Sequence, residues 1–123
     1  MANKGRLKIT RVLAAVGSLS LAGAVYAQDA QLQCDIGPVT KTFGSVPWLL
    51  YGCDDGSSVV LVSAPGSPAA PFYFIFSPES GGYHLRGEGT GAKSATDAAL
   101  KELQALTPEQ IRALRREAVS KKP

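Results

Sequence analysis

The chain has 123 residues and a formal net charge of +3, and 45% of its residues are hydrophobic. This length suits one small domain beside a leader rather than two domains. Four of the 13 basic residues and none of the 10 acidic residues lie in the first eleven positions, so the remainder has a net charge of −1. Its charge therefore gives no reason to expect a nucleic-acid binder.

The first 27 residues have the layout of a cleavable signal peptide. A basic start precedes an uncharged stretch, Val12–Gln28, which is rich in Val, Leu and Ala and contains the small-residue exit Val25-Tyr26-Ala27. Export machinery and signal peptidase recognise these three parts. The sequence predicts cleavage between Ala27 and Gln28 and a single exported domain, residues 28–123, in the periplasm or outside the cell.

A retained membrane anchor is the competing interpretation of this segment. An anchor needs about 20 predominantly apolar residues, whereas Val12–Gln28 is shorter and is diluted by Gly and Ser. A lipoprotein is also disfavoured, because Cys34 follows Gln33 where a lipobox requires a small residue. We therefore expect no stable membrane span after cleavage.

Both cysteines, Cys34 and Cys53, remain after cleavage. In an oxidising compartment an even number of cysteines favours a disulfide, and this pair lacks the C-x-x-C spacing of redox motifs. Closing a loop of this length stabilises a fold by ~3 kcal/mol on the chain-entropy model, a large share of a small domain's stability. We expect a structural disulfide between them.

The first half of the exported domain is typical of β-strands separated by turns. Strands are expected at Leu32–Ile36 and Trp48–Cys53, with Gly and Pro residues between them. The Asp-Asp-Gly segment at 54–56 then joins the second strand to Val59–Ala64. Its glycine supplies the positive φ that a tight hairpin requires.

The middle of the domain alternates loops and strands. Three prolines within Ala64–Pro71 predict a stiff surface loop. Phe72–Phe76 is apolar at every position, which predicts a central strand covered on both faces. After Pro78–Gly82, the segment Tyr83–Glu88 alternates apolar and polar residues, as expected of a strand with one buried face.

The last third changes to helical periodicity. Apolar residues recur at helical spacing over Ala95–Leu106, and the preceding Ser94 opens a segment that resembles a capping box. Thr107 is expected to cap a second helix, with Pro108 at its first position and Gln110 completing another box. Strands followed by helices indicate an α+β fold: a small antiparallel β-meander of four to five strands with one or two C-terminal helices.

A glycine-rich segment at 87–94 precedes the first predicted helix. It departs from the P-loop pattern at Ala92, and a second helix follows where nucleotide-binding folds need further parallel strands, so nucleotide binding is disfavoured. Two interpretations remain. Gly89, Gly91, Lys93 and Ser94 bind a simple anion at the helix N-terminus, or the glycines permit a sharp strand exit and Ser94 caps the helix. The second is favoured.

Groups suited to catalysis or metal binding are sparse. His84 is the one histidine in the sequence, and a hydrolase would need it beside a buried carboxylate and a hydroxyl. The acidic pair Asp54 and Asp55 is explained by turn chemistry rather than by a metal. We expect no catalytic residues, no metal site and no cofactor, with a small hydrolase using His84 left open as an alternative.

Two surface features could contact a partner. The aromatic run Phe72–Phe76 is one, although large apolar residues on a strand usually form the core of so small a domain. The other is a basic C-terminal cluster, which forms a solvated helix face or contacts an anionic membrane or partner. Its members are Arg112, Arg115, Arg116, Lys121 and Lys122.

Two short segments resemble a known family. Tyr51-Gly52-Cys53-Asp54-Asp55-Gly56 followed by a strand, with Ser80-Gly81-Gly82-Tyr83 later, resembles the periplasmic inhibitors of c-type lysozyme, which are small disulfide-bearing β-barrel proteins. The two C-terminal helices are foreign to that family's pattern. The family's inhibitory loop is therefore not carried over to this chain.

These features favour a non-catalytic binding or inhibitor module that acts on an envelope or secreted protein. Its contact surface is expected at the Ala64–Pro71 loop or at the turns of Gly81–Gly91. An envelope structural or stress protein that uses its basic tail is the first alternative, and a small hydrolase is the second.

Overall fold

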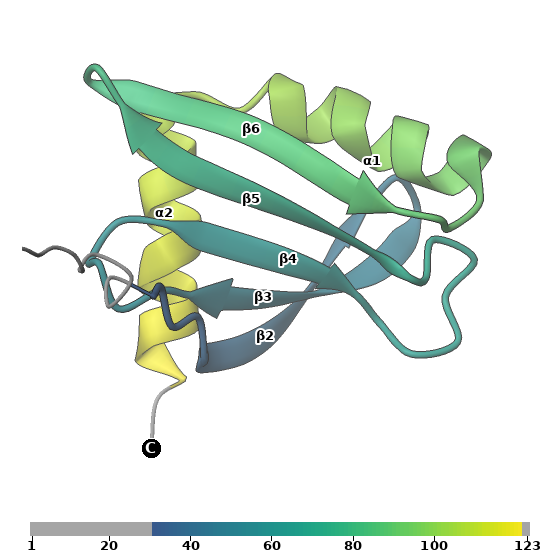
Figure 1. Cartoon of the computed structure of the whole chain (residues 1–123), viewed down its shortest axis with the longest axis horizontal. Helices are drawn as coiled ribbons and strands as arrows, with labels where there is room; N and C mark the ends of the chain where they lie inside the picture. The colour runs from purple at the N-terminus through teal and green to yellow at the C-terminus, as the bar shows by residue number, and fades with distance from the viewer. Residues whose placement is uncertain (1–30, 122–123) are drawn as a thin grey trace, which may run out of the picture. The chain divides into compact units, whose positions relative to one another are not determined.

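A computed structural model describes residues 31–121 and shows five antiparallel strands followed by two helices (Figure 1). The α+β fold expected from the sequence is confirmed. The predicted signal peptide, residues 1–27, and its cleavage site between Ala27 and Gln28 lie outside the described residues. The elements are β2 (Ile36–Phe43), β3 (Val46–Gly52), β4 (Val59–Ser63), β5 (Phe72–Glu79), β6 (Gly82–Gly89), α1 (Lys93–Gln104) and α2 (Pro108–Ser120).

The five strands form one sheet in the order β2-β3-β4-β5-β6, so each strand pairs with its neighbours in sequence. Between β3 and β4, Asp55 Oδ1 accepts hydrogen bonds from the amides of Ser57 at 2.9 Å and Ser58 at 2.7 Å. Gly56 has a φ of 78°, a conformation that glycine adopts without strain. The predicted hairpin is confirmed.

The first strand differs from its predicted position. We expected it at Leu32–Ile36, but β2 begins at Ile36. It continues through Gly37 and Pro38 to Phe43, where the sequence predicted a break. Its pairing with β3 shifts register between Ile36 and Val39, where Gly37 and Pro38 lie. β2 is an edge strand, and an edge tolerates a proline because its missing N–H need not join the ladder.

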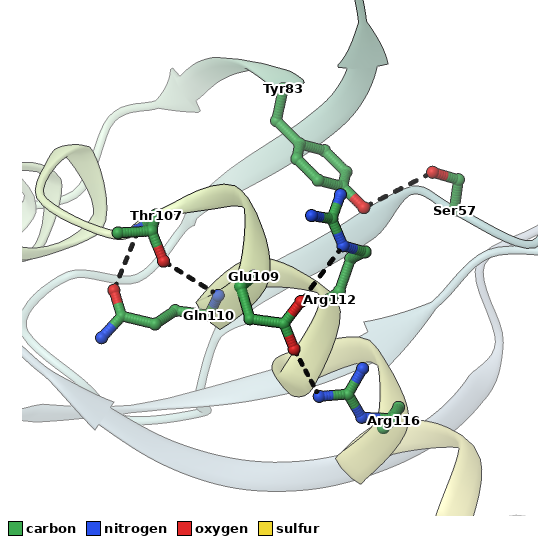
Figure 2. Close-up of polar contacts among 7 residues, drawn as sticks. All are labelled: Ser57, Tyr83, Thr107, Glu109, Gln110, Arg112 and Arg116. Atoms are coloured by element: carbon green, nitrogen blue, oxygen red, sulfur yellow. Dashed lines mark hydrogen bonds and ion pairs between the residues drawn. The ribbon is translucent and has the colours of Figure 1, made fainter. Parts of the chain in front are cut away.

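The second helix begins as predicted, and the first does not. Thr107 Oγ1 accepts from the amide of Gln110 at 3.1 Å, and Gln110 Oε1 accepts from the amide of Thr107 at 2.9 Å (Figure 2), which confirms the capping box. α1 begins directly after Ala92, which makes no side-chain cap. Ser94 therefore lies inside the first turn, and the prediction that it caps the helix is wrong.

Both helices pack on one face of the sheet, and the core lies between the two layers (Figure 1). Trp48 is fully buried there, and its Nε1 donates to the carbonyl of Phe43 at 3.0 Å. The turn after β2 approaches α1 so closely that a Cβ on Gly44 would lie 2.5 Å from the Ala99 nitrogen. The main core side chains are Trp48, Leu50, Val59, Leu61, Phe74, Phe76, Leu103, Ile111 and Leu114.

The opposite face of the sheet has neither helix on it in residues 31–121 (Figure 1). Side chains alternate along a strand, so every second residue of β4 and β5 faces away from the helices. On β5, Ile75 lies between the buried Phe74 and Phe76 and is itself only half-buried. Phe72–Phe76 is an interior strand as predicted, but within residues 31–121 the helices cover only one of its two faces.

Candidate functional site

An apolar patch occupies the face of the sheet that the helices leave open. Six half-buried apolar or aromatic side chains of β3, β4 and β5 lie there in two cross-strand rows. Contiguous apolar patches on a protein surface mark interaction sites. The rows of this open-face patch are Leu49, Val62 and Tyr73, and Tyr51, Val60 and Ile75.

A cavity of about 480 Å³ continues the open-face patch toward the start of β5 and the end of β6. The Ala64–Pro71 loop reaches it through Pro71, and the Gly81–Gly91 segment reaches it through Gly89. Both segments were expected contact surfaces, and the structure places them at the same cavity. Its lining consists of Val60, Val62, Pro71, Phe72, Tyr73, Glu88, Gly89 and Thr90.

The charged groups that border the patch compensate each other. β6 places Arg86 beside Ile75 and Glu88 beside Tyr73, and Arg86 Nε lies 3.9 Å from Glu88 Oε2. Both side chains are exposed, so the pair adds little stability. On β2 the border residue is the uncharged Thr40. This border carries no net charge and suits an uncharged partner better than nucleic acid or an anionic membrane.

The glycine-rich segment before α1 permits close packing between two loops. A Cβ on Gly91 would lie 1.8 Å from the carbonyl oxygen of Ala69. The amides of Thr90 and Gly91 donate to the carbonyl of Pro71 at 2.9 and 3.1 Å. The amide of Ala92 donates to the carbonyl of Pro68 at 2.9 Å. Glycine is thus needed at position 91 because the neighbouring backbone is too close for a side chain.

The candidate anion-binding residues Gly89, Gly91, Lys93 and Ser94 lie together where the chain enters α1. Lys93 Nζ lies 3.6 Å from Asp97 Oδ1, and both side chains are exposed. The amide of Gly91, one of the donors that an anion would use, is already bound to a carbonyl. Anion binding at this turn stays a prediction.

The predicted disulfide between Cys34 and Cys53 is present. It ties the segment before β2 to the residue after β3. The same connection is reinforced by backbone contacts, because the amide of Asp54 donates to the carbonyl of Gln33 at 2.8 Å. The disulfide therefore attaches the segment before β2 to the base of the β3–β4 hairpin loop.

Asp55 organises this loop. Burial raises the pKa of its carboxyl, but hydrogen bonds from the Ser58 hydroxyl and from the amides of Ser58 and Ser57, with the nearby Arg115 cation, hold the pKa below its ordinary value. Ser58 is buried and its hydroxyl donates to Asp55 Oδ2. Turn chemistry accounts for Asp55, as the sequence predicted.

α2 gathers three arginines beside the hairpin loop. Figure 2 shows Glu109 between two of them: its carboxylate lies 3.1 Å from Arg116 Nη2 and 3.6 Å from Arg112 Nε. The hydrogen bond and charge of Arg116, aided by Arg112, hold the pKa of Glu109 below its ordinary value. The third, Arg115, is half-buried and donates from Nη2 to the carbonyl of Cys53 at 2.8 Å.

The arginines thus differ from the basic helix face expected from the sequence. Arg112 and Arg116 are exposed, but Arg115 turns inward onto the hairpin. Lys121 follows α2 and is exposed, and Lys122 lies outside the described residues. The sequence indicated a cluster by the spacing of its charges, but it did not indicate that Ser57 and Tyr83 lie beside it.

The remaining candidates are His84 and the acidic side chains. His84 is exposed on β6, and the buried polar side chains of residues 31–121 are the hydroxyls of Ser58, Ser63 and Thr96 rather than a carboxylate. In this range no three His, Cys, Asp or Glu side chains gather as metal ligands. Nor does the described part of the chain contain a helix that is long and apolar enough to cross a membrane.

The sequence offered the aromatic run Phe72–Phe76 as a contact surface but favoured the core for it; Tyr73 and Ile75 of this run lie in the open-face patch, and the residues of β3 and β4 beside them were not predicted. The strands at Val59–Ser63 and Phe72–Glu79 place apolar residues on both faces, while the chain offers only two helices to cover them in residues 31–121. No protein-family model, curated protein or solved structure matches this chain.

Proposed function

We propose that this domain is a non-catalytic binding module of the periplasm or the extracellular space, and that its open-face patch contacts a protein of the same compartment. The observation that supports this most is the patch itself. Its six apolar side chains lie in register on three strands beside a cavity of about 480 Å³. A sheet that holds these side chains in place loses little conformational freedom on binding.

Two independent observations support export. The basic start and uncharged stretch of residues 1–27 have the composition of a signal peptide. The disulfide between Cys34 and Cys53 fits an oxidising compartment, because structural disulfides are rare in the cytosol. Together they favour an envelope or secreted protein as the partner.

The partner that fits this surface presents an uncharged apolar segment. Arg86 and Glu88 neutralise each other at the border, so a charged group on the partner would find no free opposite charge there. The cavity has a volume in the lower part of the range of ligand pockets and accepts apolar side chains of the partner. An apolar contact of this kind gains affinity from the area that it removes from water.

The test is the substitution Val62→Lys. Val62 is in the patch and also lines the cavity, so a lysine places an unpaired charge in the contact. Thr42→Lys is the matched control. Thr42 lies on β2, on the same face of the sheet as Val62, and it is exposed and outside the patch. We expect the mature wild-type protein and Thr42→Lys to capture a stoichiometric partner from an envelope extract of the native cells. Val62→Lys should reduce that affinity by about tenfold or more.

Three outcomes would contradict the proposal. Unchanged affinity of Val62→Lys for the partner would remove the open face from the contact. Repeated recovery of no partner by the wild-type protein would count against a binding module. A wild-type homodimer in analytical ultracentrifugation that Val62→Lys abolishes would assign the patch to a second copy of the chain. Inhibition of c-type lysozyme is a parallel assay, suggested by the resemblance at residues 51–56.

A further inference from the structure

We propose that α2 and the β3–β4 hairpin form a binding site for a phosphate group, held by Arg112, Arg115 and Arg116 together with the hydroxyl groups of Ser57 and Tyr83. The site shares no residue with the open-face patch, so it is a second function of the domain.

The three arginines converge because of their spacing on one helix. Arg115 and Arg116 follow Arg112 by three and four residues, so each of them neighbours Arg112 on the surface of α2. All three line a cavity of about 210 Å³ with Gly56, Ser57 and Tyr83. The lining therefore contains three cationic side chains and no anionic one.

Arg115 is held in place from the protein side. Its stem passes Gly52, on which a Cβ would lie 3.6 Å from Arg115 Cγ, and its Nη2 donates to the carbonyl of Cys53 at 2.8 Å. Its Nε is buried and has no hydrogen-bond partner among residues 31–121. This Nε is enclosed by the protein, against Gly52, so an oxyanion in the cavity that this side chain lines would meet the other N–H groups of the guanidinium.

The other two guanidinium groups share the carboxylate of Glu109 (Figure 2). Its carboxylate contacts Arg112 and Arg116 but is not part of the cavity lining. The other acidic group beside Arg115 is Asp55, whose oxygens already accept hydrogen bonds within the hairpin loop. Three arginines thus face two carboxylates, Glu109 and Asp55, and the group keeps a net charge of +1.

The donors in the cavity match a tetrahedral oxyanion. Guanidinium groups bind phosphate through paired N–H donors. Ser57 Oγ and Tyr83 Oη are hydrogen-bonded to each other at 3.5 Å beside them (Figure 2), so one O–H is engaged and the other is a neutral donor for the ligand. The small volume accommodates a free phosphate ion or the terminal phosphate of a small monoester, which present the same oxygens.

The test is a titration of the mature protein, with its disulfide intact, with inorganic phosphate at constant ionic strength. Backbone amide NMR should show saturable shifts at Gly56, Ser57 and Tyr83. Arg116→Gln should weaken binding about tenfold, because a charged hydrogen bond is lost. Glu109→Gln should strengthen binding, because a competing carboxylate is removed.

Arg86→Gln is the matched control, since this exposed arginine lies on β6 at the open face and should leave the affinity unchanged. A second titration with glycerol phosphate tests whether the ligand is a free phosphate ion or the terminal phosphate of an ester. Shifts at the same amides support the terminal phosphate of an ester, and shifts with inorganic phosphate alone support the free ion. Equal shifts with chloride, shifts centred on Gly89–Ala95, or unchanged affinity in a folded Arg116→Gln variant would each overturn the site.

Discussion

On the helix side of the sheet Leu61 and Phe74 are 0% and 1% exposed, whereas on the other side their neighbours Val60 and Ile75 remain half-buried. The two sets of side chains are similarly apolar and alternate along the same strands. What separates them is the second layer, because both helices pack on one side. Apolar residues on a strand therefore indicate a surface to be buried, but not whether the chain itself buries it.

The largest expected difference between the faces comes from truncating one side chain on each. Phe74→Ala should lower the free energy of unfolding by about 3–5 kcal/mol, because it leaves a cavity in the core beside Trp48. Ile75→Ala should cost only about 1 kcal/mol, because cross-strand contacts alone are lost. Urea unfolding measures both. Equal losses would show that the open face is covered as fully as the core.

The disulfide should matter to both faces, because it ties the segment before β2 to the end of β3. Replacing Cys34 and Cys53 together by Ser should lower the free energy of unfolding by about 3 kcal/mol. The same loss is expected on the background of Val62→Lys, since a substitution on the open face and the crosslink act independently. Unchanged stability without the disulfide would contradict a structural role.

The wall of the open-face cavity depends on the contact between two loops. Gly91→Ala should lower the free energy of unfolding by about 2–3 kcal/mol, because the added Cβ collides with the carbonyl of Ala69. Gly82→Ala is the control, since a Cβ there would meet its nearest atom only at 3.8 Å. Similar thermal stability of the two variants would mean that the loops are not tightly packed.

The smallest effect is expected from pH at the hairpin. Asp55 has a lower pKa in the folded chain than its ordinary value of 3.8, so its carboxylate stabilises the fold above that pH and the contribution is lost as the pH falls through the folded pKa. The free energy of unfolding should therefore decrease below about pH 4, with a shallower decrease in Asp55→Asn. Chemical unfolding across this range measures the slope, and equal slopes would contradict the assignment.

Local signals in the sequence were sufficient for one hairpin turn and one helix cap. The Asp-Asp-Gly segment predicted a hairpin, and Thr107 with Gln110 predicted a helix start, because each depends on residues close in sequence. The prediction that Ser94 caps α1 was wrong, because contacts between the Pro68–Pro71 loop and the chain before α1 decide where that helix begins. The Arg115 contact with Cys53 could not be predicted either, since it joins residues that only the packing of α2 on the sheet brings together.

Photo-crosslinking in the native cells tests most directly whether the open face contacts a partner. A benzophenone amino acid replaces Tyr73 in the open-face patch in one variant and Lys101, which is exposed on α1, in another. We predict a covalent adduct with one protein from position 73 and none from position 101. An adduct from position 101 alone, or none from either position, would contradict the account.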